Sequence, residues 1–200
     1  MALEISGAYL VLHSPLAKSS PANMYWSVDA TFQYRNTTIL NLNDAPGIFD
    51  TGSMKLYLAK GVLLRDSQLQ VNMYSHLMYI LEAYNQYVQA TGAVKDDSTG
   101  FLSITPHQYE RLESLYFKIG QCTYELNANA QIWPRDLNYI LEGTGDLVYL
   151  IVSELGRDDL DGVGFIFGSR VLERFYVVFD SQNHRVGLAN TKFTNSTAIN

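Results

Sequence analysis

The sequence predicts a mainly β fold with short helices, formed by one domain. Aromatic residues make up 12% of the chain and include 14 tyrosines; together with many β-branched residues they favour strands. Hydrophobic residues at 47% and charged residues at 17% indicate a globular chain. The 200 residues suffice for a single domain with a core of its own.

The first strands are predicted from alternating apolar positions. Residues 25–39 place Trp26, Phe32 and Tyr34 on one face, as a half-buried strand requires. Residues 41–46 are typical of a turn, after which a further strand leads into Asp50.

The second half of the chain predicts one short helix and several strands. Residues 106–116 predict the helix, with Thr105 as its N-cap and Pro106 in its first position. The strands are predicted over residues 117–126, 148–152, 175–180 and 185–189. Residues 181–184 form the hairpin between the last two strands.

Composition excludes two classes of partner. A net charge of −6 and a pI near 5.1 argue against nucleic acid, which requires a basic face. No stretch reaches the ~20 apolar residues of a membrane helix, so no membrane partner is expected. No signal peptide is visible either, because residues 1–10 lack a basic segment and carry Glu4 within their apolar run.

Neither a metal nor a cofactor is expected. The histidines are scattered without metal-ligand spacing and are expected on the surface or in loops: His13, His76, His107 and His184. Residues 158–162 lack the spacing and final glutamate of a calcium loop and predict a solvated loop. Cys122 is the only cysteine, which excludes an internal disulfide, and we expect it to be buried.

The motif most informative about function is IFDTGS at residues 48–53, a strand that runs into a tight turn and presents the carboxylate of Asp50. Farther along the chain stand FIFG at residues 165–168, FYVVFD at 175–180 and RVGLA at 185–189. An Asp-Thr-Gly alone recurs by chance, whereas this ordered combination is far more specific. The combination resembles the C-terminal lobe of a pepsin-like aspartic endopeptidase.

Further segments narrow the resemblance to the polyporopepsin-like fungal acid proteinases. They are SPANMYW at residues 20–26, expected to be a strand, ATGAV at 90–94, ANAQIWPR at 128–135 and LERFY at 172–176. The resemblance implies a single lobe of the bilobal pepsin-like acid protease fold over residues 20–192. Residues 1–19 match no part of that pattern, and residues 193–200 form a C-terminal tail.

The resemblance implies an enzyme that cleaves protein or peptide substrates at acid pH, is found outside the cell and needs no cofactor. Aspartic proteases use two facing carboxylates that share a proton and activate a water. Asp50 is implied to be the carboxylate of this lobe. Gly52 is expected to donate its N–H to that carboxylate and Ser53 its hydroxyl, and Thr51 corresponds to a buried threonine that links two lobes.

Other positions are implied to support the site or to contact substrate. Gly168 corresponds to the glycine at which a neighbouring strand passes the Asp50 loop. Ile166 and Ser169 are the expected substrate-binding residues. Lys55 departs from the pattern, and a lysine that pointed inward here would perturb the carboxylates.

One segment does not fit the family pattern. Residues 61–81 separate the strand after Asp50 from a helix expected to begin near Glu82. Their 21 codons preserve the reading frame, which favours a translated intron or a gene-model artefact. The alternative is a genuine helical extension, since Leu69, Met73 and Leu77 recur at every fourth residue.

No second Asp-Thr/Ser-Gly occurs, so three states of the chain stay open. The chain is one half of a two-lobed enzyme whose N-terminal lobe is missing, or it pairs with a second copy so that two Asp50 residues form a dyad. In the third state it is an inactive fragment that serves as a non-catalytic peptide-binding module.

Overall fold

The computed structural model describes residues 2–6, 9–40, 46–60, 83–156 and 162–197, with residues 2–10 and 40 described by their backbone alone. The insertion predicted at residues 61–81, His76 and most of the turn at 41–46 and of the loop at 158–162 lie outside these ranges.

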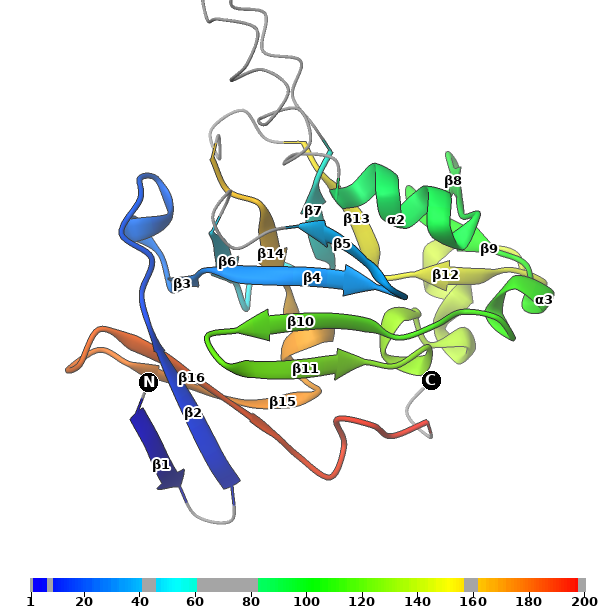
Figure 1. Cartoon of the computed structure of the whole chain (residues 1–200). Coiled ribbons are helices and arrows are strands. Elements are labelled where there is room, and N and C mark those ends of the chain that lie inside the picture. Colours follow the sequence, from blue (N-terminus) through cyan, green and yellow to red (C-terminus); the bar gives the residue numbers. More distant parts are fainter. Residues whose placement is uncertain (1, 7–8, 41–45, 61–82, 157–161, 198–200) are drawn as a thin grey trace, which may run out of the picture.

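Strands dominate the described residues (Figure 1). In the first half they are β1 (Ala2–Ser6), β2 (Tyr9–Pro15), β3 (Ser27–Val28), β4 (Ala30–Tyr34), β5 (Thr37–Leu40), β6 (Gly47–Phe49), β7 (Leu56–Ala59) and β8 (Val94–Asp96). In the second half they are β9 (Phe101–Ile104), β10 (Leu115–Ile119), β11 (Cys122–Leu126), β12 (Val148–Leu150), β13 (Val152–Leu155), β14 (Phe165–Phe167), β15 (Phe175–Asp180) and β16 (Arg185–Asn190).

The helices are few and short. The α-helices are α2 (Ala83–Thr91), α3 (Pro106–Tyr109) and α4 (Ser169–Leu172), and the 3-10 helices are η1 (Ala22–Met24), η2 (Asn129–Gln131) and η3 (Arg135–Leu141). None of them, within the described ranges, has the length and hydrophobicity needed to cross a membrane. The mainly β fold with short helices is therefore confirmed.

A mixed sheet at the centre positions the loop that carries Asp50. Its strand order is β13-β7-β14-β6-β3. β14 lies between β6, to which it is parallel, and β7, to which it is antiparallel. Because β6 ends at Phe49, Asp50 leaves the sheet at the carboxyl end of an interior strand, flanked by β14 and β3.

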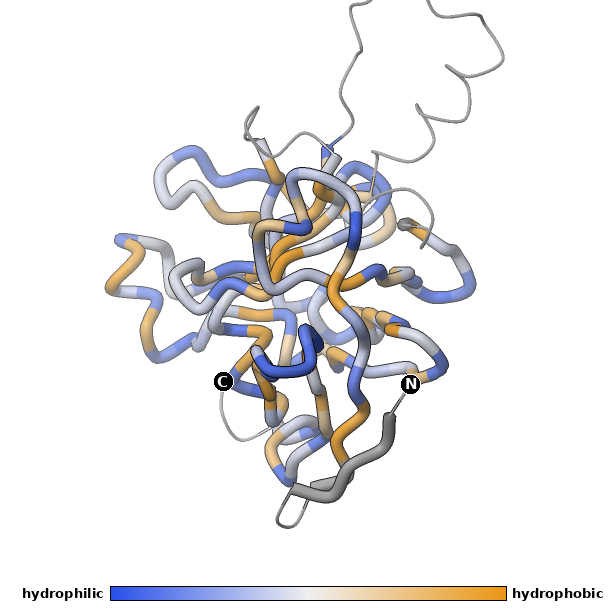
Figure 2. Tube along the Cα trace, turned by 90° about the vertical axis from the view of Figure 1, so that its left-hand side faces the viewer, coloured by the Kyte–Doolittle hydropathy of each residue, from blue (hydrophilic) through white to orange (hydrophobic). Residues whose placement is uncertain are grey.

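Aromatic side chains fill the core beneath this sheet. Phe32, Phe117, Phe165 and Phe167 are each at most 1% exposed. Their rings lie 4.7–5.9 Å apart in edge-on and tilted arrangements, which aromatic pairs prefer. The hydrophobic stretches of the chain run largely through the middle of the molecule, and hydrophilic ones gather in outer loops (Figure 2).

Five elements differ from the sequence prediction. The strand expected over residues 148–152 is interrupted at Ile151, where β12 ends and β13 begins in another sheet. Residues 20–26, expected to be a strand, contain η1 instead, since Met24 donates its N–H to the Pro21 carbonyl over a tight i+3 turn. The strand expected over residues 25–39 is divided among β3, β4 and β5, with a two-residue turn in which Arg35 has φ 54°.

The helix expected over residues 106–116 begins as predicted and ends early. Thr105 and Gln108 form the reciprocal capping box, and Pro106 is the first helical residue. The helix stops at Tyr109, and Leu115 instead begins β10, which pairs with β4. The strand expected over residues 117–126 is a hairpin of β10 and β11 that turns at Gly120, where φ is +59°.

Candidate active site

The Asp50 loop begins with backbone bonds to the central sheet. The Asp50 N–H donates to the Phe167 carbonyl at 3.0 Å, which continues the parallel pairing of β6 with β14. The chain then turns back, and the Ser53 N–H donates to the Asp50 carbonyl at 3.3 Å. These bonds fix the main chain on both sides of the Asp50 side chain.

The Asp50 carboxylate accepts two hydrogen bonds from its own loop. The Gly52 N–H donates to Oδ1 at 2.9 Å, and the Ser53 hydroxyl donates to Oδ2. Both donors are those expected from the sequence. Since each carboxylate oxygen is engaged from the loop, the plane of the carboxylate is set before any substrate is present.

The first turn of α4 holds the loop from below. The N–H groups of Gly168, Ser169 and Arg170 donate to the carbonyls of residues 55, 53 and 54, at 3.0, 2.7 and 3.1 Å. A Cβ atom at Gly168 would stand 2.4 Å from the Lys55 carbonyl oxygen, so this close approach requires glycine. Gly168 therefore lies where the resemblance expects the supporting glycine.

A cleft of about 1120 Å³ opens at the Asp50 loop. Its walls are formed by Leu16, Asn23, Met24, Tyr25, Trp26, Ile48, Phe49, Asp50, Thr51, Ser53, Tyr57, Ser153, Glu154, Leu155, Gly156, Ile166, Phe179, Ser181 and His184. Met24 is 70%, Tyr25 44% and Phe179 38% exposed, so the rim is both apolar and uncovered. A carboxylate in an apolar-walled cleft is an arrangement that can act on an extended, partly apolar ligand.

The expected site residues divide between this cleft and its surroundings. Asp50, Thr51, Ser53 and Ile166 line it. Thr51 was expected to be buried, but in this chain it is exposed, because no described residue covers that side of the loop. Ser169 is exposed at the start of α4 and is not among the cleft residues.

Lys55 points away from the carboxylate. Its ammonium donates to the Gly100 carbonyl at 3.1 Å and stands 3.5 Å from the centre of the Phe101 ring, a cation–π contact. Burial, followed by repulsion from Lys95, lowers the pKa of Lys55 to about 8. The perturbation considered for an inward-pointing lysine therefore does not arise from this arrangement.

Among the cleft residues that were not singled out as site residues from the sequence are Trp26, Tyr57 and Phe179. Tyr57 lies between buried Leu56 and Leu58 on β7, so strand alternation turns it to the cleft side. Burial, and to a smaller degree the Asp50 charge, raise the pKa of Tyr57. The Trp26 and Phe179 rings lie 5.3 Å apart although they come from opposite ends of the chain.

The remaining residue expectations have mixed outcomes. His13 was expected at the surface, yet it is 4% exposed within β2. Cys122, expected to be buried, is half-buried at the start of β11. Among the described residues no group of three or more His, Cys, Asp or Glu side chains could hold a metal ion.

The chain is similar in sequence and fold to known proteins. A model of the eukaryotic aspartyl protease family matches residues 11–191. Polyporopepsin of Irpex lacteus is 42% identical over 188 residues, which cover 94% of this chain and 49% of polyporopepsin. The crystal structure of an aspartic proteinase from Irpex lacteus superposes with a TM-score of 0.78 at 41% identity, covering 94% of this chain and 48% of that one. The chain thus spans about half the length of these relatives.

Proposed function

This chain belongs to the eukaryotic aspartyl protease family, and from that membership we propose that it is the C-terminal half of an aspartic endopeptidase and supplies one carboxylate, Asp50, to a two-aspartate dyad. The observation that carries the proposal is the Asp50 carboxylate at the cleft, which accepts one hydrogen bond from Gly52 and one from Ser53. The fold itself is a single lobe of the pepsin-like fold.

The proposed chemistry divides proton transfer between two carboxylates. The ionised member of the dyad takes a proton from a water, and the water oxygen adds to the peptide carbonyl carbon. The protonated member donates its proton to the carbonyl oxygen. When the C–N bond breaks, a proton passes to the leaving amine, and the two products are a carboxylic acid and an amine. Asp50 has a single carboxylate, so the second comes from elsewhere.

The substrates proposed are proteins or peptides with bulky apolar side chains near the cleaved bond. The aromatic wall of Trp26 and Phe179 supports this, together with Ile166 on β14. Thr51 is proposed to become buried against the partner lobe. Ser169 is exposed beside the loop and is proposed to contact substrate only beyond the cleft described above.

The partner lobe is tested by complementation. The 200-residue chain is co-refolded with the half of polyporopepsin that it does not match, and proteolysis of a denatured protein is measured at about pH 3–5. We expect activity in the mixture and its loss with Asp50→Asn. Glu113→Gln is the matched control, since Glu113 is a surface carboxylate paired with Arg35. Equal activity with Asp50→Asn in the mixture would contradict the proposed role of Asp50.

A pair of identical chains is the second arrangement that completes a dyad. The exposed apolar rim of Met24, Tyr25 and Phe179 favours it, because a second copy covers these residues equally well. The chain alone would then be active, with a rate that rises as the square of its concentration at low concentration. A linear dependence, or no activity from the folded chain alone, contradicts this arrangement.

A non-catalytic peptide-binding module is the third candidate, favoured by a cleft whose walls come from this chain alone. Such a module would change the fluorescence of Trp26, which lines the cleft, when an apolar peptide is added to the chain by itself. The same titration with Asp50→Asn would give an unchanged affinity. Binding that requires the partner lobe contradicts the module.

We propose an extracellular location by analogy with the resembled family. Two glycosylation sequons, at Asn36 and Asn195, have exposed asparagines, which suits that location. Mass spectrometry of the chain recovered from a secreting host tests it. Glycan at either asparagine supports the proposal, and retention of the chain inside the cell contradicts it.

A further inference from the structure

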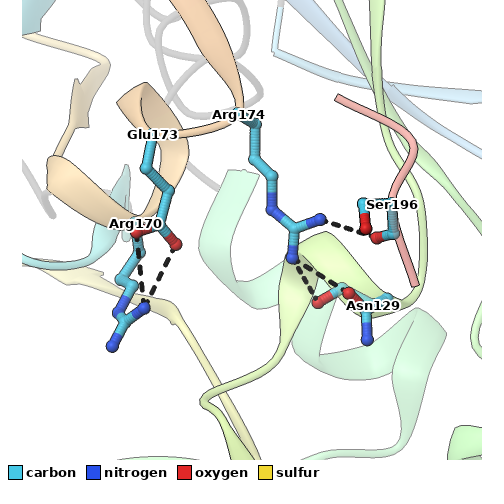
Figure 3. Close-up of polar contacts among 5 residues, drawn as sticks. All are labelled: Asn129, Arg170, Glu173, Arg174 and Ser196. Atoms are coloured by element: carbon cyan, nitrogen blue, oxygen red, sulfur yellow. Dashed lines mark hydrogen bonds and ion pairs between the residues drawn. The ribbon is translucent and has the colours of Figure 1, made fainter. Parts of the chain in front are cut away.

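An arginine lies buried just after α4 without a carboxylate partner among the described residues. Arg174 is 1% exposed, and its guanidinium donates only to neutral acceptors. Nη1 donates to the Ser196 carbonyl at 2.8 Å, and Nη2 donates to the carbonyl and Oδ1 of Asn129 at 3.3 and 3.0 Å (Figure 3). Burial lowers the pKa of Arg174. A cation buried in this way carries a desolvation cost that its few acceptors have to offset.

The neighbouring carboxylate is engaged elsewhere. Glu173 pairs with Arg170, whose Nη1 stands 3.1 and 3.4 Å from its two carboxylate oxygens. Figure 3 shows this pair on one side of the α4 end and the Arg174 cluster on the other. Glu173 is therefore not hydrogen-bonded to Arg174, whose guanidinium donates to Asn129 and Ser196 instead.

Besides Asn129, the Arg174 guanidinium contacts the end of the described chain, residues 191–197. Besides the Ser196 contact, the Arg174 carbonyl accepts the Thr194 hydroxyl at 2.6 Å and the Thr191 hydroxyl at 3.3 Å. Thr194 is 2% exposed. Arg174 thus holds residues 191–197 with both its side chain and its main chain, and we name this set of contacts the Arg174 clasp.

The opposite end of α4 holds the Asp50 loop. α4 has only four residues, so the clasp and the loop lie at the two ends of one short rigid element. At its start the Ser169 N–H donates to the Ser53 carbonyl at 2.7 Å, and the Ser53 hydroxyl donates to Asp50. A displacement of α4 is therefore transmitted to the donor that orients the carboxylate.

We propose that Arg174 is a positioning residue for Asp50, which acts by anchoring α4 to residues 191–197. The clasp fixes where α4 ends, α4 fixes the Ser53 carbonyl, and Ser53 holds the carboxylate. The importance of Asp50 rests on the function proposed above, whereas the link from Arg174 to the loop is a property of the folded chain. The two are therefore tested separately.

Amide hydrogen exchange of the folded 200-residue chain measures this link without any activity assay. Arg174→Lys keeps the charge but loses the forked geometry that reaches Ser196 and Asn129 together. We expect the Ser169 N–H, which bonds to the loop, to exchange about tenfold faster in this variant. The N–H of Phe117, within strand β10 of a different sheet, is expected to keep its rate.

Two further variants make the test specific. Thr194→Val removes the hydroxyl bonded to the Arg174 carbonyl, and we expect a smaller acceleration in the same direction. Glu173→Gln disrupts the pair with Arg170 but not the clasp, and it should leave Ser169 unchanged. Equal acceleration at Ser169 and Phe117 would reveal general destabilisation and overturn the proposal. An unchanged Ser169 in Arg174→Lys, or an equal effect of Glu173→Gln, would also overturn it.

Discussion

The two sides of the Asp50 loop are built differently. Below the loop Phe165 and Phe167 are at most 1% exposed and pack against the other core rings. On the cleft side Met24, Tyr25 and Phe179 are 38–70% exposed. A buried aromatic side chain removes ~150–250 Å² from water, whereas an exposed one removes far less. The described residues thus support the carboxylate from below and leave the cleft side of the loop exposed.

The largest effect is expected from the core side. Phe167→Ala should lower the free energy of unfolding by about 4 kcal/mol, since Phe167 is 1% exposed and its removal leaves a cavity below the loop. Urea unfolding followed by tryptophan fluorescence measures the loss. Phe179→Ala is the matched control on the cleft side, with an expected loss below about 1 kcal/mol. Equal losses of unfolding free energy in the two variants would contradict the difference between the core side and the cleft side of the loop.

A smaller effect is expected at the contact between α4 and the loop. Gly168→Ala should cost about 2 kcal/mol, because the new methyl group would stand 2.4 Å from the Lys55 carbonyl oxygen. Gly145→Ala is the control, as a Cβ there meets nothing within 4 Å. The same unfolding experiment compares the two. An unchanged free energy of unfolding in Gly168→Ala would mean that the loop can move away from α4 without cost.

A pH-dependent effect of at most about 1 kcal/mol is expected from the partly exposed Lys55. Its pKa is about 8 in the folded chain and near 10.5 when unfolded, so between these values the unfolded chain binds more protons. Lys55 therefore makes the chain less stable below pH 8, and this penalty disappears as the pH rises towards 10.5. The difference in stability between Lys55→Met and the parent chain should shift in favour of the parent over this range. A constant difference would contradict the lowered pKa.

The smallest effect on stability is expected at the cleft rim. Met24→Ser should change the free energy of unfolding by less than about 0.5 kcal/mol, since Met24 is 70% exposed. It should nevertheless weaken self-association, which sedimentation velocity measures, because the rim loses exposed apolar area. Thr38→Ser, at an exposed position of β5, is the control. Unchanged self-association in Met24→Ser would show that this rim does not mediate contacts between copies of the chain.

The sequence anticipated the parts of the molecule that local patterns determine. The alternation in residues 30–34, the capping signal at Thr105 and the strand into Asp50 all fold as expected. The helix predicted to run to residue 116 was too long, because Leu115 begins β10, which pairs with β4, a strand distant in sequence. The hydrogen bonds from the Gly52 N–H and the Ser53 hydroxyl to the Asp50 carboxylate were foreseeable from the motif at residues 50–53. The cleft walls and the Arg174 clasp were not, since each joins segments that lie far apart along the chain.

One pairing in the fold has a consequence for how the chain assembles. β2 and β16 are neighbours in one sheet, with Leu12 opposite Leu188, although almost the whole chain separates them. Contacts of such long sequence separation carry a large loop-closure entropy and slow folding. On the ribosome β2 emerges well before β16. The sheet that contains both strands is therefore completed only after the strands of the central sheet have been synthesised, and Leu12 lacks its neighbour Leu188 until then.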